Sequence, residues 1–108
     1  MQAHSMPARI ESQVFEGEPV IEVSGHWDQG AVESLIRTFR ECLERVDKRL
    51  YLRLDGLDFL DSSALSVILF YMRELAKRDA KLVLLQPSPE MRELLHVVSL
   101  DQVLEIRD

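Results

Sequence analysis

Segments in which apolar and polar side chains alternate are separated three times by longer segments in which apolar residues recur every three or four positions. The first pattern is typical of β-strands and the second of amphipathic α-helices. Two strand patterns come first, and each later one follows a helical pattern. Strands joined through a helix of this length run parallel, through right-handed crossovers. We therefore predict an α/β fold with a mixed, mostly parallel sheet of about five strands and three main helices, in the order β-β-α-β-α-β-α-β.

The first two strands are expected at 9–15 and 20–24, and a turn at 16–19 makes them an antiparallel hairpin. Apolar Ile10 and Val14 alternate with polar neighbours in the first of them, which predicts a half-buried strand. The other elements are expected over these ranges: helices at 28–46, 61–79 and 88–98, strands at 50–54, 81–85 and 103–106, and a loop at 55–60.

The expected helices begin at residues whose side chains can accept hydrogen bonds from the first free backbone N–H groups. These residues are Asp28, Asp61 and Ser88. Pro89 follows Ser88 at the first helical position, where a missing N–H removes no helical hydrogen bond. We expect all three to act as N-caps.

Composition excludes several classes of function. The 108 residues are enough for one domain, and their formal charge of −6 argues against nucleic acid as a partner. A single cysteine, Cys42, rules out an internal disulfide and fits a reducing compartment. No apolar run reaches the roughly 18 residues of a membrane span, so we expect a cytoplasmic protein without membrane insertion. Residues 1–8 are expected to form a flexible tail, in which either Met1 or Met6 is the native start.

In a parallel sheet the carboxyl ends of the strands lie along one edge, where binding sites of open α/β sheets gather. We therefore expect Asp28, Asp61, Ser62 and Ser63 to be neighbours in space, although they are far apart in sequence. Three segments are predicted to reach this edge: 25–28, 55–63 and 86–88.

Ser62 stands at the expected start of the second helix, beside unpaired N–H groups that tolerate an anion such as phosphate. It could equally be a simple cap. A catalytic role is not predicted, because no Gly-x-Ser-x-Gly elbow surrounds it. The histidines and Cys42 lack metal-ligand spacing, and the glycines form no phosphate-binding loop. We expect a protein that is not an enzyme and has no metal or cofactor.

Aromatic and apolar side chains near Ser62 allow two interpretations. Trp27 is either a contact residue for a protein partner or part of the core. Val67, Phe70 and Tyr71 widen the apolar stripe of the second helix beyond one face. They either lie under neighbouring elements or form an exposed contact patch.

The segment 57–65, Leu-Asp-Phe-Leu-Asp-Ser-Ser-Ala-Leu, resembles the signature loop of the STAS-domain family of anti-sigma-factor antagonists. The segment 23–28 resembles the glycine-x-x-aspartate turn of that family, and 94–106 is similar to its last helix and exit. The resemblance runs from about Ile10 to Ile106, which implies one STAS-like domain over 9–108. Where the family usually has glycine, this chain has Ala64, Ser66 and Ser99.

The resemblance implies a partner-switching regulator that binds a serine-kinase anti-sigma factor and is switched off by phosphorylation on Ser62, until a serine phosphatase restores it. The residues implied in partner binding are Trp27, Asp28, Asp61, Ser63, Ala64 and Ser66. The replaced glycines support an alternative without phosphorylation, namely an accessory subunit of a lipid-transport ABC complex or of a multimeric stress-sensing assembly. The chain could be a monomer or a dimer.

Overall fold

The computed structural model describes residues 7–27 and 29–108. Its elements confirm the predicted order of strands and helices. They are β1 (Arg9–Phe15), β2 (Glu18–Trp27), η1 (Gln29–Ala31), α1 (Val32–Leu43), β3 (Arg49–Leu60), α2 (Ser62–Ala76), β4 (Lys81–Leu85), α3 (Pro89–Val97), η2 (Leu100–Gln102) and β5 (Glu105–Arg107). The predicted tail falls largely on residues 1–6, which lie outside the described residues. No helix in the described part of the chain is long and apolar enough to cross a membrane.

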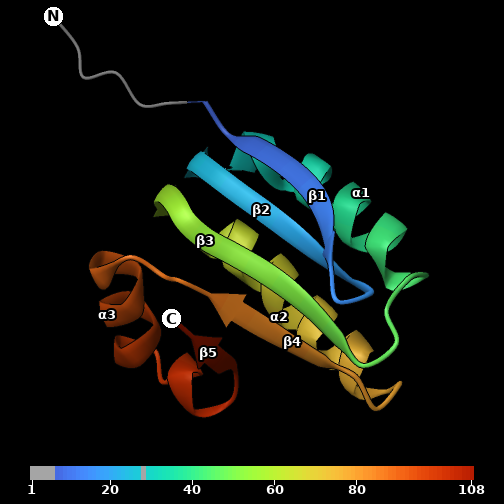
Figure 1. Cartoon of the computed structure of the whole chain (residues 1–108). Coiled ribbons are helices and arrows are strands. Elements are labelled where there is room, and N and C mark those ends of the chain that lie inside the picture. The colour runs from blue at the N-terminus through green and yellow to red at the C-terminus, as the bar shows by residue number, and fades with distance from the viewer. Residues whose placement is uncertain (1–6, 28) are drawn as a thin grey trace, which may run out of the picture.

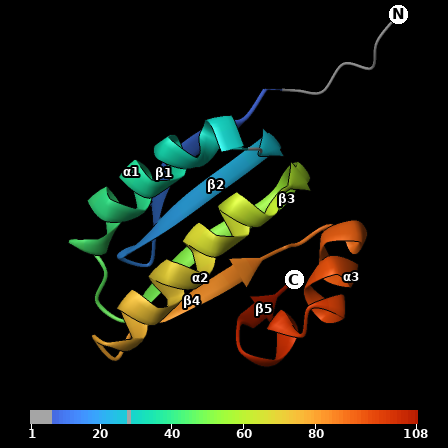
Figure 2. The ribbon, with the colours of Figure 1, turned by 180° about the vertical axis from the view of Figure 1, so that it is seen from behind.

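The five strands form one sheet in the order β1-β2-β3-β4-β5. Only β1 and β2 are antiparallel, and the other neighbouring strands are parallel. Helices α1 and α2 cover the same face of this sheet, and α3 lies beyond the end of β4 (Figures 1 and 2). The predicted mixed α/β fold with an antiparallel first hairpin is therefore confirmed.

The main core lies between the sheet and the two helices on its face. Alternate strand residues point into it, since successive side chains of a strand point to opposite faces. The helices contribute Phe39 from α1 and Tyr71 from α2, whose rings stack with centroids 4.6 Å apart. The fully buried strand residues on this side are Ile21, Trp27, Leu50, Leu52, Leu54 and Leu84. A third helix residue, Cys42, is also buried here as a small apolar side chain.

The prediction of a loop at 55–60 is wrong, because these residues form the second half of β3. Asp55 and Gly56 suggest a turn, yet β2 also continues to Trp27 and pairs with β3 up to Leu60. The register shifts between Glu22 and Ser24, as at a β-bulge. Glycine is needed at 56 for close approach of the strands, because a Cβ there would lie 2.9 Å from the Ser24 Cβ.

Three further expectations are corrected. The first helix begins at Val32, with Ala31 at its N-cap position, because residues 29–31 form a 3-10 turn. Strand β1 is less buried than predicted: Ile10 is half-buried against the core, but Val14 is 67% exposed. Strand β4 ends opposite Arg53, well before the end of β3, so 86–88 does not extend the ladder between these two strands to the edge where β2 and β3 end.

Glu18 begins β2 and is a buried acid that the sequence pattern assigned to a turn. Only 9% of its surface is exposed. Its carboxylate accepts hydrogen bonds from the backbone N–H groups of Asp47, Lys48 and Arg49, at 3.0, 2.9 and 3.0 Å. Burial raises the pKa of Glu18, but these three hydrogen bonds and the Arg49 charge outweigh it, and the net pKa lies below 4.5. Glu18 therefore ties the start of β3 to the start of β2.

We predict that Glu18→Gln lowers the free energy of unfolding at pH 7 by about 1.5–3 kcal/mol, because it removes a charged acceptor from three N–H groups. A carboxylate with a lowered folded-state pKa contributes its full stability above the unfolded-state pKa, and the contribution is lost as pH falls through the folded-state pKa. The difference between variant and wild type should therefore shrink in urea unfolding at pH 3. Glu16→Gln, in the exposed turn, is the control and should change stability by less than about 0.5 kcal/mol. Equal effects of both variants would contradict the role of Glu18.

We further predict that Gly56→Ala destabilises the protein by about 1–3 kcal/mol, because its new methyl group meets the Ser24 side chain. Ser24→Gly removes that obstacle and should recover part of the loss in the double variant. A double-mutant cycle by urea unfolding measures this coupling. Additive effects of the two substitutions would show that the close approach of β2 and β3 does not require glycine.

Candidate functional site

The paired ends of β2 and β3 set the position of the Asp61-Ser62-Ser63 segment. The parallel ladder ends at the pair Trp27 and Leu60, and the next N–H, that of Asp61, donates to the carbonyl of Trp27 at 3.1 Å. Helix α2 begins at Ser62, immediately after this hydrogen bond. The start of α2 is thus fixed beside the end of β2, and Asp28, the next residue of that segment, lies outside the described residues.

Asp61 is the N-cap of α2, as the sequence predicts. Its Oδ1 accepts hydrogen bonds from the backbone N–H groups of Ser63 and Ala64, at 3.0 and 3.1 Å, and from the Ser63 hydroxyl at 2.6 Å. The hydrogen bond from the Ser63 hydroxyl lowers the pKa of Asp61 most, with further lowering by these N–H groups and by nearby His26. Asp61 therefore remains a carboxylate at neutral pH.

The two adjacent serines have different surroundings. Ser63 is half-buried, and its hydroxyl is held by Asp61. Ser62 is exposed, and its Oγ has no hydrogen-bond partner among the residues that the structure describes. As the first residue of α2, Ser62 lies where backbone N–H groups are not used within the helix. Of the two hydroxyls, that of Ser62 is the one open to an incoming enzyme.

Ser66 is one helical turn after Ser62 and is also exposed. Its hydroxyl donates to the Ser62 carbonyl at 2.8 Å. This hydrogen bond leaves the Ser62 Oγ untouched. Ser62 and Ser66 therefore place two exposed hydroxyl side chains one turn apart at the start of α2.

Two of the residues implied in partner binding are core residues. Trp27 is 1% exposed, and its indole Nε1 donates to the Ser24 carbonyl at 2.7 Å. Ala64 is fully buried, since its methyl group faces the sheet. The expectation that these side chains contact a partner is corrected. Of the two interpretations of Trp27, core packing is the one that the structure shows, and both residues act by holding the Ser62 segment in place.

The residues at the family's glycine positions are accommodated in different ways. Ala64 lies inside the first turn of α2, where alanine is favoured over glycine. Ser99, after α3, has a left-handed backbone with φ of 62°, a conformation that glycine adopts most easily. The replacement at 99 thus carries backbone strain, whereas the one at 64 does not.

Sequence reasoning missed two features of this region. His26 is half-buried close enough to Asp61 to help hold that carboxyl in its charged form, and no local sequence pattern indicates this proximity. Phe70 is 51% exposed, whereas Val67 and Tyr71 on the same stripe are buried. The apolar periodicity of α2 could not separate these three residues, because it does not say which neighbours cover them.

Comparisons with known proteins point to one family. The family model described as "STAS domain" matches residues 9–108. A STAS-domain containing protein of Pseudomonas aeruginosa is 32% identical over 92 residues, which cover 82% of this chain and 87% of that protein. The anti-sigma F factor antagonist of Lysinibacillus sphaericus is 34% identical over 76 residues, covering 69% of this chain and 65% of that protein.

A solved structure with a similar fold is that of the anti-sigma factor antagonist SpoIIAA in its unphosphorylated form. It has a TM-score of 0.76 and 25% identity, and the match covers 91% of this chain and 87% of that one. The phosphorylated form of SpoIIAA, a Bacillus cell fate determinant, has a TM-score of 0.70 and 27% identity, covering 93% and 90%.

We predict that Ser63→Ala and Ser62→Ala have different effects on the helix start. Ser63→Ala removes the hydrogen bond that most lowers the pKa of Asp61, so this pKa should rise toward its ordinary value and the urea midpoint should fall. Ser62→Ala removes no hydrogen bond among the described residues and should leave both quantities unchanged. NMR titration of the Asp61 carboxyl carbon measures the pKa. A larger shift for Ser62→Ala than for Ser63→Ala would contradict this assignment.

Proposed function

Because the chain belongs to the STAS-domain family, we propose that it is a partner-switching regulator of the anti-sigma-factor antagonist type. It binds an anti-sigma factor that is itself a serine kinase. That kinase phosphorylates Ser62, the complex dissociates, and a serine phosphatase restores the binding form. The chain's own role is to bind and to be modified, and it carries out no catalytic step.

The observation that carries this proposal is the environment of the Ser62 hydroxyl. A kinase must bring the acceptor oxygen into line with the γ-phosphate, so a hydroxyl that is exposed and unbonded is the best acceptor. Ser62, at the start of α2, is exposed, and its hydroxyl has no hydrogen-bond partner in the part of the chain that the structure describes. The neighbouring Ser63 does not meet this requirement, since its hydroxyl is already bound to Asp61 at 2.6 Å.

Electrostatics explain how one phosphate could release a partner without unfolding the protein. The phosphate adds about −1.5 to −2 charges at the positive end of the α2 dipole, where an anion is tolerated. The same charge appears beside the Asp61 carboxylate, on a chain with formal net charge −6. A partner that packs over Ser62 would have to remove water from this new dianion, and any acidic group of that partner would be repelled by it.

Two relatives support the proposal by their described roles. The Lysinibacillus relative is named as an anti-sigma F factor antagonist, and the structural relative SpoIIAA is described in both an unphosphorylated and a phosphorylated form. We transfer to this chain the role of antagonist and the use of phosphorylation. The choice of Ser62 as the modified residue comes from the resemblance of its loop to that of the family, and the exposed position of its side chain supports it.

The alternative, a constitutive subunit of a lipid-transport ABC complex or a multimeric sensor, rested on the replaced glycines. Ala64 is fully buried, so its methyl group does not change the surface that a partner meets. Ser66 remains exposed, and its hydroxyl bonds back to its own helix. The replacement at 64 therefore gives no support to the alternative.

The test is phosphorylation by purified serine-kinase anti-sigma factors of the source organism with ATP, followed by intact mass measurement and site mapping. We expect one phosphate on the wild type and on Ser63→Ala, and none on Ser62→Ala. Binding of the same kinase should weaken about tenfold or more in Ser62→Asp, equivalent to about 1.4 kcal/mol, and persist in Ser62→Ala. Modification at another residue, or none with every kinase, would overturn the proposal.

A further inference from the structure

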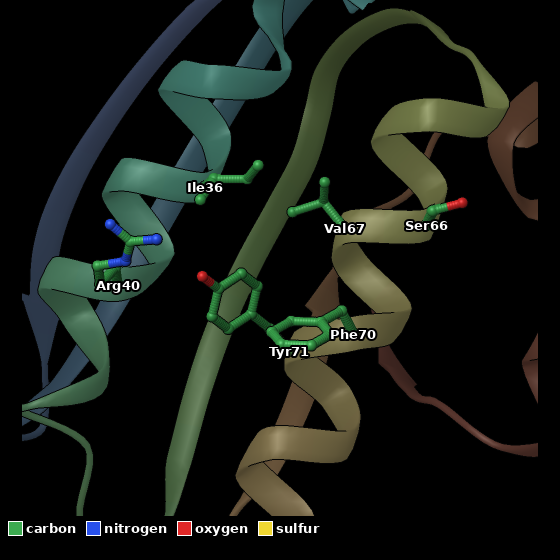
Figure 3. A pocket seen from close by; sticks show the side chains of 6 residues that line it. All are labelled: Ile36, Arg40, Ser66, Val67, Phe70 and Tyr71. Atoms are coloured by element: carbon green, nitrogen blue, oxygen red, sulfur yellow. The ribbon is translucent and has the colours of Figure 1, made fainter.

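A groove between α1 and α2 lies next to the exposed side chains of Ser62 and Ser66. Its volume is about 270 Å³. Figure 3 shows Ile36 of α1 and Val67 of α2 pointing toward each other across it, and the ring of Tyr71 reaching between the helices. The lining residues are Ile36, Arg40, Ser66, Val67, Phe70 and Tyr71.

The groove has a rigid apolar floor and an exposed aromatic wall. Val67 and Tyr71 are buried, and Tyr71 is held by stacking on Phe39. Phe70 meets the Tyr71 ring edge to face, with centroids 5.0 Å apart, yet half of its surface faces solvent. A large aromatic side chain left exposed beside a hollow is the typical anchor point of a protein contact.

Positive charge lies along the α1 side of the groove. Arg40 lines the groove, and Arg37 joins it in the adjoining hollow, which also contains Glu33 and Ile36. Neither arginine takes part in an ion pair among the described residues. The residues that line the two hollows thus include two arginines and one glutamate, on a chain whose net charge is negative. This local excess of positive charge is complementary to an acidic partner.

The groove is close enough to Ser62 to be covered by the same partner. Ser66 lines the groove and bonds to the Ser62 carbonyl. Phe70 is eight residues after Ser62, which is about 12 Å along a helix at ~1.5 Å per residue. A standard interface buries about 800 Å² per partner, a patch about 16 Å in radius. A partner centred on Ser62 therefore reaches Phe70.

We propose that this groove is the docking site for an acidic amphipathic segment of the partner that approaches Ser62. The segment places one bulky aliphatic or aromatic side chain between Ile36 and Phe70. Its carboxylates face Arg37 and Arg40. The assignment of this segment to the kinase rests on the function proposed above, whereas the chemistry of the groove does not.

The first test measures the affinity of the kinase that modifies Ser62 for groove variants. Phe70→Ala and Arg40→Glu should each weaken binding about tenfold. Val97→Ala and Arg45→Glu are matched controls, exposed and outside the groove, and should stay within about twofold of wild type. Unchanged affinity of both groove variants for a kinase that still modifies Ser62 would overturn the docking site and leave the proposed function intact.

The second test needs no kinase. A 15-residue helical peptide with a leucine stripe flanked by glutamates is titrated into the ¹⁵N-labelled protein, beside a copy with lysines in place of the glutamates. We expect amide shifts at Ile36, Arg40 and Phe70, at least fivefold tighter binding of the glutamate peptide, and the reverse preference in Arg40→Glu. The proposal would be overturned by equal binding of both peptides or by the absence of shifts at the groove. It would also be overturned by groove shifts that depend only on protein concentration, because these would indicate that a second copy of the chain occupies the groove.

Discussion

The long parallel pairing of β2 with β3 is the constraint on which the rest of the structure depends. It is fixed at both ends. At one end the Glu18 carboxylate holds the N–H groups of residues 47–49, and at the other the Asp61 N–H donates to the Trp27 carbonyl. Between them the strands approach so closely that residue 56 must be glycine. Because β3 is paired with β2 as far as its last residue, the position of the start of α2 is fixed. The buried side chain of Trp27 lies at this end of the ladder.

The three residues that follow the ladder, Asp61, Ser62 and Ser63, have different roles. Asp61 and Ser63 satisfy the free N–H groups of the helix and one another, so the helix start is stable without Ser62. The Ser62 hydroxyl has no hydrogen-bond partner among the described residues and lies at the positive end of the helix dipole. The groove lined by Ile36, Arg40 and Phe70 lies further along α2. In the function proposed above, one partner meets both this groove and Ser62.

Much of this could be predicted from the sequence because strand and helix periodicities differ and because caps have a local signature. The fold class, the Asp61 and Ser88 caps and the position of Ser62 at the start of a helix followed from such signals. The second half of β3 could not be predicted, since Asp55-Gly56 has the composition of a turn and only the neighbouring strand explains the glycine. Glu18 was missed because its partners are about 30 residues away, and the exposure of Phe70 depends on which helix lies beside it.

The central claim is that a rigid ladder and cap hold the Ser62 hydroxyl outward, and amide hydrogen exchange tests it most directly. The N–H groups of Asp61, Ser63 and Ala64 are the relevant probes, because they donate to Trp27 and to the Asp61 carboxylate. The account predicts that they are protected, and that Asp61 N–H exchanges within about tenfold of the interior amides of β3. Exchange of all three at the rate of an unstructured chain would contradict it.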